Sequence, residues 1–262
     1  MMKVRIIGKK GYRMSFVLED ATPAFANALR RAMTSEVPTM AVDWIDVREN
    51  NSALFDEIIA HRMGMIPLNF DPKKFNFTSE CECEGKGCPA CQVVFVMEKT
   101  GPGMAHSGDL KSSNRDVKPT SPDFPIVELL KGHAIKLEAV ARLGLGANHA
   151  KFQAANVVYQ YYPEIRLKEG AGQRDIEKGV KACPKAALSM KGSKPVVDAE
   201  LCNFSRSCEL ASNGAIKMEG DQTKFIFRVE SVSGLEPEYI VQKACEVLEG
   251  KAAEFRKHLK EL

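Results

Sequence analysis

ATPAFANALRRAMTSEVPTMAVDWIDV, residues 21–47, predicts a helix that leads directly into a strand. Thr22 is suited to the N-cap position and Pro23 to the first helical position. Pro38 ends the helical pattern, and residues 41–50 then alternate as a half-buried strand does. The residues that form one apolar stripe of this helix are Phe25, Leu29, Ala32 and Met33. Such a stripe must be covered, either by a sheet of the same chain or by a second chain.

The composition is that of an ordinary soluble globular protein. The chain has 262 residues, of which 44% are hydrophobic and 27% charged, and its formal net charge is +3. So small a charge argues against a broad nucleic-acid-binding face, and no apolar stretch approaches the roughly 20 residues that cross a bilayer. The N-terminal residues alternate and carry charges, unlike a signal peptide. We therefore expect a cytoplasmic protein of two or three domains, in which eight cysteines favour metal over disulfides.

The other predicted elements mix strands and helices without regular βαβ alternation, which indicates an α+β fold. Residues 3–7 and 12–18 alternate as a hairpin with glycines at its turn. A short helix is predicted within 52–68, a long helix from 234 onward, and an exposed loop over the Gly-, Ser- and Pro-rich residues 101–125. Further strands are predicted over 92–100, 133–146, 156–167 and 224–233.

Residues 81–91, CECEGKGCPAC, contain four cysteines in the pattern C-x-C-x4-C-x2-C. Four thiolates suit a closed tetrahedral zinc site, with Zn–S distances of about 2.3 Å. Gly85, Gly87 and Pro89 let the backbone turn back so that its amides can face the sulfurs. The cysteines that we predict to bind Zn2+ are Cys81, Cys83, Cys88 and Cys91.

Two other interpretations of this motif are weaker. Free surface thiols are disfavoured by the turn residues that bring the four cysteines together. A redox pair at Cys88 and Cys91 would belong at a helix N-terminus in a βαβ context, whereas here a strand is predicted to follow. Nothing in the motif indicates catalysis, so the predicted zinc staples a loop that could not hold its shape alone.

A second cysteine-rich segment, residues 183–216, resembles one half of a bacterial-type ferredoxin, whose pattern is C-x2-C-x2-C-x3-C-P. Cysteines occupy the first and third positions of that pattern and the remote Cys-Pro position. Serines stand where the second and fourth cysteines belong. In chain order these residues are Cys183, Cys202, Ser205, Cys208 and Ser212.

Three thiols suffice for a cuboidal cluster that has lost one iron, so a [3Fe–4S] cluster is chemically sensible. A [4Fe–4S] cluster would need Ser205 or a ligand from outside the segment. The alternative is a ferredoxin-like fold that keeps relict thiols and no cluster. A second cluster is excluded because Gln173, Ile176 and Gly179 hold the places of its cysteines. The remaining Cys245, in the predicted terminal helix, is expected to be a core thiol.

The terminal helix carries an apolar seam wide enough to pack on another helix. The residues of this seam, spaced by threes and fours, are Val241, Ala244, Leu248, Ala252, Phe255, Leu259 and Leu262. Because a helix rises about 1.5 Å per residue, we expect this long one to protrude and to contact a second subunit. The sequence shows no nucleophile–base constellation, phosphate loop or carboxylate metal cluster, so we assign no reaction to this chain.

Three stretches together resemble the RNA polymerase alpha-subunit family. Residues 21–47 are similar to its first helix and following strand, and residues 61–68, HRMGMIPL, to its R-x-G-x-I-P-L segment. Residues 129–155 resemble the archaeal and eukaryotic branch closely. With the predicted zinc loop and ferredoxin-like insert, the resemblance narrows to the archaeal members of that branch, the counterparts of the third-largest subunit of the eukaryotic enzyme. It spans nearly the whole chain.

The resemblance implies a non-catalytic scaffold. Residues 1–48 and 222–262 would form a split dimerisation domain, 49–165 an inserted β-rich domain with the zinc loop, and 166–221 a ferredoxin-like domain. The family pairs with the small subunit L, docks the small subunits N and P, and then binds the two large catalytic subunits, so no direct nucleic-acid or membrane contact is expected. The residues expected at subunit interfaces are Leu29, Arg30, Arg31, Val241, Leu248, Phe255 and Leu259.

Two other functions compete with this scaffold. An iron–sulfur electron-transfer or redox-sensing protein would show a reversible redox couple, yet a lone degenerate half-site has no visible partner site. A zinc-bearing nucleic-acid binder would carry a basic, aromatic-laced stripe, which the near-neutral charge does not favour.

Overall fold

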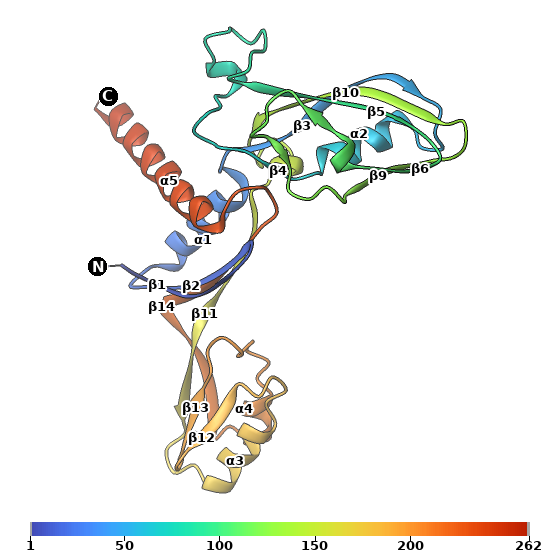
Figure 1. Ribbon diagram of the computed structural model, residues 1–262. Helices are drawn as coiled ribbons and strands as arrows, with labels where there is room; N and C mark the ends of the chain where they lie inside the picture. The colour runs from blue at the N-terminus through green and yellow to red at the C-terminus, as the bar shows by residue number, and fades with distance from the viewer. Residues whose placement is uncertain (1, 261–262) are drawn as a thin grey trace. The chain divides into compact units, whose positions relative to one another are not determined.

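The computed structural model describes residues 2–260, which form two compact units (Figure 1). The first unit contains the residues up to Lys10, then Met14–Asn27 and Val158–Arg228. The second contains Gly11–Arg13, Ala28–Val157 and the residues from Val229 onward. Helices combine with several small sheets, in agreement with a mixed α and β fold. The three domains predicted from the sequence stay predictions.

A four-stranded sheet runs through the first unit in the order β1-β2-β14-β11. Its strands are β1 (Lys3–Lys10), β2 (Arg13–Glu19), β14 (Ile216–Ser231) and β11 (Ala155–Leu167). Aromatic side chains from three of these strands meet: Phe16 and Phe227 stack with ring centroids 5.0 Å apart, and Tyr159 lies 5.3 Å from Phe227. The predicted hairpin is confirmed, and its turn uses Gly11 at φ +53°, where a side chain would be strained.

The remaining elements of the first unit share a small core of their own. They are α3 (Gln173–Lys181), β12 (Leu188–Lys191), β13 (Lys194–Val197) and α4 (Ser207–Ala211). β12 and β13 form an antiparallel hairpin, and α3 contacts both α4 and β12. The buried residues of this local core are Ile176, Leu188, Cys208, Ala215, Ile216 and Met218. The segment therefore holds together through its own packing, and its likeness to ferredoxin stays a prediction.

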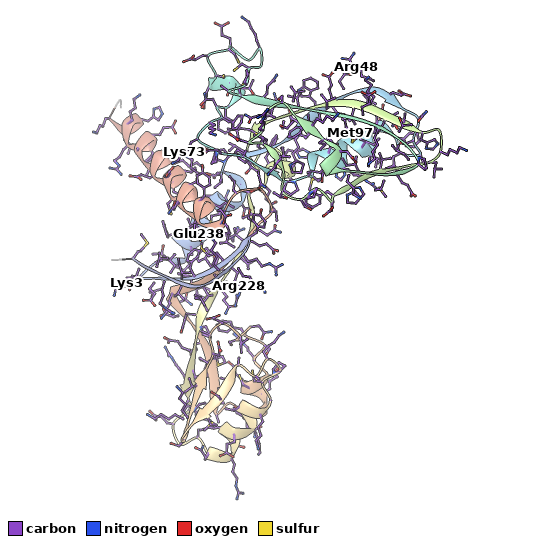
Figure 2. All side chains as sticks on the ribbon, viewed as in Figure 1. Lys3, Arg48, Lys73, Met97, Arg228 and Glu238 are labelled. Atoms are coloured by element: carbon purple, nitrogen blue, oxygen red, sulfur yellow. The ribbon has the colours of Figure 1, made fainter. Side chains whose placement is uncertain are left out.

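A second four-stranded sheet, in the order β3-β10-β5-β7, organises the second unit. Its strands are β3 (Thr39–Asn50), β10 (Ala134–Gly144), β5 (Gln92–Thr100) and β7 (Lys111–Ser112). β10 is antiparallel to both neighbours, and the register sets Ala139 opposite Ile45 of β3 and Phe95 of β5. Alternate residues of β5, among them Val93, Phe95 and Met97, are fully buried, so one face of this strand lies in the core (Figure 2).

Short elements complete the second unit. α2 (Asp56–Gly64) packs on β3 and on β9 (Pro125–Leu129). β9 pairs with β6 (Gly103–His106), and β4 (Leu68–Asn69) pairs with β8 (Lys118–Pro119). Single 3-10 turns span Thr78–Glu80, Ser107–Asp109 and Ala150–Phe152.

The prediction of an exposed loop over residues 101–125 is wrong. β6, β7 and β8 lie within it, and Ala105, Ser107 and Val117 are fully buried. Each of these short strands pairs with a strand outside the segment or at its very end. Tertiary pairing, which a local pattern of Gly, Ser and Pro does not reveal, therefore overrides the loop signal.

Two long helices remain, α1 (Pro23–Ser35) and α5 (Pro237–Leu259). Each begins with proline, which suits a position whose amide would have no helical partner. The backbone N–H of Phe25 donates to Thr22 Oγ1 at 3.2 Å, so the predicted N-cap of α1 is confirmed.

Candidate metal site and partner-binding surface

The four predicted zinc ligands lie together in the loop before β5. Sγ of Cys81 is 3.5 Å from Sγ of Cys88, and Sγ of Cys83 is 3.6 Å from Sγ of Cys91. All four ligand atoms lie within 4.8 Å of one another, the only such group of three or more His, Cys, Asp or Glu side chains in residues 2–260. A tetrahedron of Zn–S bonds of about 2.3 Å separates its sulfurs by about 3.8 Å. The observed spacing therefore fits a single metal ion.

Two tight turns give the loop its shape. The N–H of Lys86 donates to the carbonyl of Cys83 and the N–H of Cys91 to that of Cys88, both at 3.0 Å. Gly87 lies between these turns at φ +86°, a conformation that residues with side chains rarely adopt. The N–H of Cys88 also donates to Sγ of Cys91 at 3.3 Å, so a backbone amide faces a sulfur as the sequence predicts.

Burial and hydrogen bonds among the four thiols give them different pKa values. Burial opposes ionisation of Cys83, but hydrogen bonds from Cys81, Cys91 and the Gly87 amide lower its pKa to about 7. Burial raises the pKa of Cys91 to about 12. A dication that binds all four sulfurs replaces these protons with its own charge. The donor set is soft and complete, which suits zinc.

Cys183, Cys202 and Cys208 belong to the local core of the first unit. Cys208 is 6% exposed, and the other two pack against the buried residues of that core. The N–H of Ala187 donates to Sγ of Cys183 at 3.3 Å. Burial, reinforced by the nearby Cys183, raises the pKa of Cys208. Among residues 2–260, these three thiols are not part of a group close enough to hold a single metal ion.

The two serines at the degenerate positions differ in their surroundings. Ser212 is fully buried, and its hydroxyl donates to the Glu209 carbonyl at 3.1 Å and accepts from the Ile216 N–H at 3.0 Å. Ser205 is exposed. Ser212 is therefore engaged in holding α4 against the start of β14, whereas Ser205 is accessible.

Gly179 and Ile176, two of the residues that stand where a second cluster would need cysteines, take part in helix packing. A Cβ atom at Gly179 would lie 2.8 Å from the carbonyl oxygen of Cys208 and 2.9 Å from Cβ of Ser212. Ile176, one turn earlier in α3, is 4% exposed in the same core. Glycine at position 179 thus allows α3 to approach α4 closely.

The C-terminal half of the α5 seam is uncovered in this chain. Ala244 is buried and Leu248 half-buried, whereas Phe255 is 66% and Leu259 53% exposed. Leu262, the last residue of the predicted seam, lies outside the described residues. Exposed large apolar side chains along one helix face are costly in water. This face is therefore a candidate surface for a partner.

An ion pair anchors α5 within the second unit. Lys251 forms an ion pair with Glu36, Nζ to Oε2, at 2.6 Å, which ties the helix to the segment that follows α1. Val241 is half-buried. Cys245, expected in the core, is instead exposed. It lies seven residues before Ala252, and hence on the same side of the helix as the seam.

The apolar stripe of α1 is covered by this chain itself. Leu29 is 3% exposed, and Ala32 and Met33 are fully buried. The stripe of α1 therefore packs inside its own chain, which is the first of the two possibilities that the sequence left open. Leu29 offers little surface to a second chain. Arg30 is half-buried and Arg31 is exposed.

One apolar surface was missed by the sequence analysis. Trp44 of β3, Ile58 of α2 and Met65 are each about half exposed, at 51%, 44% and 53%. Trp44 and Met65 line a common small hollow with His61 and Lys151. Ile58 and Met65 are seven residues apart and so share one face of the chain around α2. The helical spacing of apolar residues within 56–65 could have indicated this surface.

An uncovered apolar helix face is typical of a chain that binds a partner. Sequence comparison identifies the class: residues 15–252 match the family described as the RNA polymerase Rpb3/Rpb11 dimerisation domain. This match covers most of the chain. The chain therefore belongs to that family.

Full-length relatives agree with this assignment. The chain is 40% identical to DNA-directed RNA polymerase subunit Rpo3 of Archaeoglobus fulgidus, over 100% of this chain and 99% of the relative. It is 37% identical to the Rpo3 subunit of Methanosphaera stadtmanae, over 96% of both chains, and 38% identical to that of Pyrococcus horikoshii, over 100% and 99%. None of the helices in residues 2–260 is long and apolar enough to span a membrane.

Proposed function

We propose that this chain is a non-catalytic assembly subunit of an archaeal DNA-directed RNA polymerase. The observation that carries the proposal is the apolar face of α5, on which Phe255 and Leu259 remain exposed although the rest of the chain has well-buried cores. Membership of a dimerisation-domain family and full-length similarity to Rpo3 subunits support it. The chain contributes a binding platform, and the reaction belongs to the complex.

We infer a particular order of partners. The small subunit L covers the seam of α5, through Val241, Leu248, Phe255 and Leu259. The small subunits N and P and then the large catalytic subunits dock on the resulting pair in the cytoplasm. Arg31, which is exposed on α1, is the arginine that we assign to a large-subunit contact, with the half-buried Arg30 beside it and Leu29 supporting the helix from within.

We infer that the four-thiol loop holds Zn2+ as a structural ion. The sulfur spacing near that of a tetrahedral site, and the absence of a fifth donor from the set, support a closed site. The ion would replace a hydrophobic core that so short a loop cannot build.

We infer that Cys183, Cys202 and Cys208 can ligate an iron–sulfur cluster, with Ser205 as the accessible candidate for a fourth position. Their common location around one core and the exposure of Ser205 support this. Thiolate ligation of iron and inorganic sulfide is the chemistry that such a group supplies. Its role here is to order the segment, since the relatives are polymerase subunits and do not support the electron-transfer alternative.

Co-expression with subunit L of the same organism tests the assembly role. We expect a stable heterodimer on size-exclusion chromatography, while the chain expressed alone self-associates through its apolar seam. A well-behaved monomer that does not bind subunit L would contradict the proposal. Metal analysis of the anaerobically purified pair, with its absorption spectrum, tests zinc and iron in the same sample.

A further inference from the structure

Three hydrogen bonds connect the loop that carries Cys202 to strands β11 and β14 of the first unit, and a fourth joins the two side chains that donate them. Gln160 Nε2 donates to the carbonyl of Cys202 at 3.0 Å and to that of Ala199 at 3.4 Å. Arg228, labelled in Figure 2, donates from Nη2 to the carbonyl of Glu200 at 3.0 Å. Its Nη1 donates to Gln160 Oε1, also at 3.0 Å. The two side chains thus form one connected clamp on three carbonyls of the loop.

The chemistry of the clamp requires an amide at position 160. A guanidinium can only donate hydrogen bonds and a backbone carbonyl can only accept them. The Gln160 side chain offers an acceptor to Arg228 and a donor to the loop at the same time. Glutamate would keep the contact with Arg228 but would place a negatively charged oxygen against carbonyl oxygens. Gln160 is therefore specific to this arrangement.

The loop that the clamp holds is itself a closed turn. Asp198 Oδ1 accepts from the N–H of Glu200 at 2.9 Å, and the Asp198 carbonyl accepts from the N–H of Cys202 at 3.1 Å. After Cys202, the backbone is constrained again, because Phe204 and Arg206 have φ of +54° and +58°. The hydrogen bonds from Gln160 and Arg228 to residues 199–202 therefore fix the position of Cys202.

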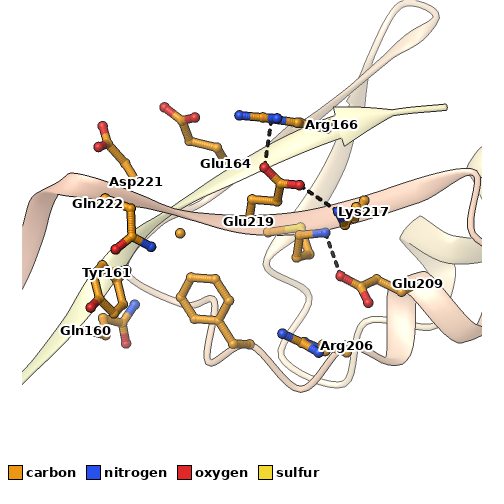
Figure 3. A pocket seen from close by; sticks show the side chains of 13 residues that line it. Gln160, Tyr161, Glu164, Arg166, Arg206, Glu209, Lys217, Glu219, Asp221 and Gln222 are labelled. Atoms are coloured by element: carbon orange, nitrogen blue, oxygen red, sulfur yellow. Dashed lines mark hydrogen bonds and ion pairs between the residues drawn. The ribbon is translucent and has the colours of Figure 1, made fainter. Parts of the chain in front are cut away.

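A groove lies beside the clamp, and Gln160 is one of the residues that line it. The groove, of about 890 Å³, is lined by residues that include Gln160 and Tyr161 of β11 and Phe204, Arg206 and Glu209 (Figure 3). Phe204 also packs on the core that contains Ile216 and Met218 of β14, and Glu209, which lines the groove, accepts from the Met218 N–H at 2.7 Å. The clamp is therefore the polar part of the contact between the loop of Cys202 and the strands.

We propose that Gln160 and Arg228 are positioning residues that fix Cys202 within the three-cysteine site and tie that site to β11 and β14. Positioning is a property of the metal-free chain. The consequence for a loaded site rests on the proposed cluster: ligation of Cys202 would restrain residues 199–202 and, through the clamp, the two strands.

The variant Gln160→Glu tests positioning, because it is nearly isosteric and retains a partner for Arg228. The control is Arg166→Gln, which removes the 2.8 Å ion pair between Arg166 and Glu219 on the same two strands (Figure 3). Alkylation of each cysteine by iodoacetamide is followed by mass spectrometry in the reduced, metal-free protein. We expect the rate at Cys202 to rise about tenfold or more, the factor for one or two lost hydrogen bonds of a network with a charged member.

In the same experiment we expect unchanged rates at Cys183 and Cys208, and unchanged rates throughout in the control. Equal acceleration at all three cysteines would mean general loosening and would overturn the positioning role. An unchanged rate at Cys202 in Gln160→Glu would overturn it as well.

The tie to the strands is tested by hydrogen exchange of residues 216–228 before and after anaerobic reconstitution with iron and sulfide. Loading should slow exchange in the parent and in Arg166→Gln but not in Gln160→Glu. The same slowing in Gln160→Glu would overturn the tie. If the parent takes up no iron or sulfide, the proposed cluster fails, whereas the alkylation rates still decide the positioning role.

Discussion

The sequence best predicts the roles of residues whose partners lie close to them in the chain. The four cysteines of the zinc loop lie within eleven positions, and their geometry depends on two local turns. A local pattern therefore contains nearly all the information that places their sulfurs. Cys245 shows the opposite case: the pattern of a terminal helix with an apolar seam placed it in the core, yet the thiol is exposed, because which helix face is covered depends on distant parts of the chain.

Cys88→Ala should release zinc. Cys88 Sγ lies 3.5 Å from Sγ of Cys81 and 3.8 Å from Sγ of Cys91, so its loss opens a closed site to water. We expect zinc content to fall well below that of the parent, and hydrogen exchange to accelerate over residues 78–95. Cys245→Ala removes a thiol outside the group and is the control. Full zinc retention in Cys88→Ala would contradict the assignment of this ligand.

Gly179→Ala should destabilise the segment around α3. The added Cβ would meet the Cys208 carbonyl oxygen at 2.8 Å, and backbone cannot move aside as a flexible side chain can. Overpacking of this kind costs about 1–3 kcal/mol. Gly8→Ala is the matched control, since nothing lies within 4 Å of its Cβ position. Urea unfolding with a probe in residues 165–218 measures the difference; equal stability of the two variants would refute the close packing of α3 on α4.

Whole elements are predictable where local signals agree, and unpredictable where pairing partners are distant. The helix α1 begins at Pro23, as the sequence predicts, and α5 begins at Pro237, three residues after its predicted start. The strands within residues 101–125 were not predicted because they are short and are held in place by pairing with β4, β5 and β9. A local sequence pattern does not show that pairing. The apolar stripe of α1 was recognised, but periodicity alone cannot distinguish a core of the same chain from a partner; the burial of Leu29 and Met33 decides for the former.

Phe255→Asp should weaken pairing through α5. Phe255 is 66% exposed in this chain, and burial of such a side chain in an interface contributes about 1.5–3 kcal/mol. Aspartate removes this term and adds a charge that must be desolvated. We expect affinity for subunit L to fall at least about tenfold, measured by titration calorimetry.

Lys257→Asp is the control for this helix. It lies two residues further along α5 and therefore on the opposite side from Phe255, so it changes the local charge without touching the seam. Normal pairing of Phe255→Asp, or equal weakening by both variants, would argue that α5 binds through another face or not at all.

At the scale of the molecule, segments from the two ends of the chain share one sheet. β1 and β2, from the first twenty residues, lie beside β14, which ends at Ser231, and β11 lies beyond it. The split dimerisation domain expected from residues 1–48 and 222–262 stays a prediction. The sheet is completed only when most of the chain has been made, because its contacts are separated by about two hundred residues and contacts of such long range are slow to form.

The zinc loop and the pairing surface should act independently. The hydrogen bonds that shape the loop run between residues 76 and 92, whereas the seam belongs to α5. Affinity for subunit L, measured for Cys88→Ala, Phe255→Asp and the double variant, forms a double-mutant cycle. Independent sites give free-energy changes that add to within about 0.5 kcal/mol. We expect Cys88→Ala alone to leave affinity nearly unchanged and Phe255→Asp to retain its zinc. A coupling well above that limit would show that zinc supports pairing directly, and that the loop is part of the dimer interface.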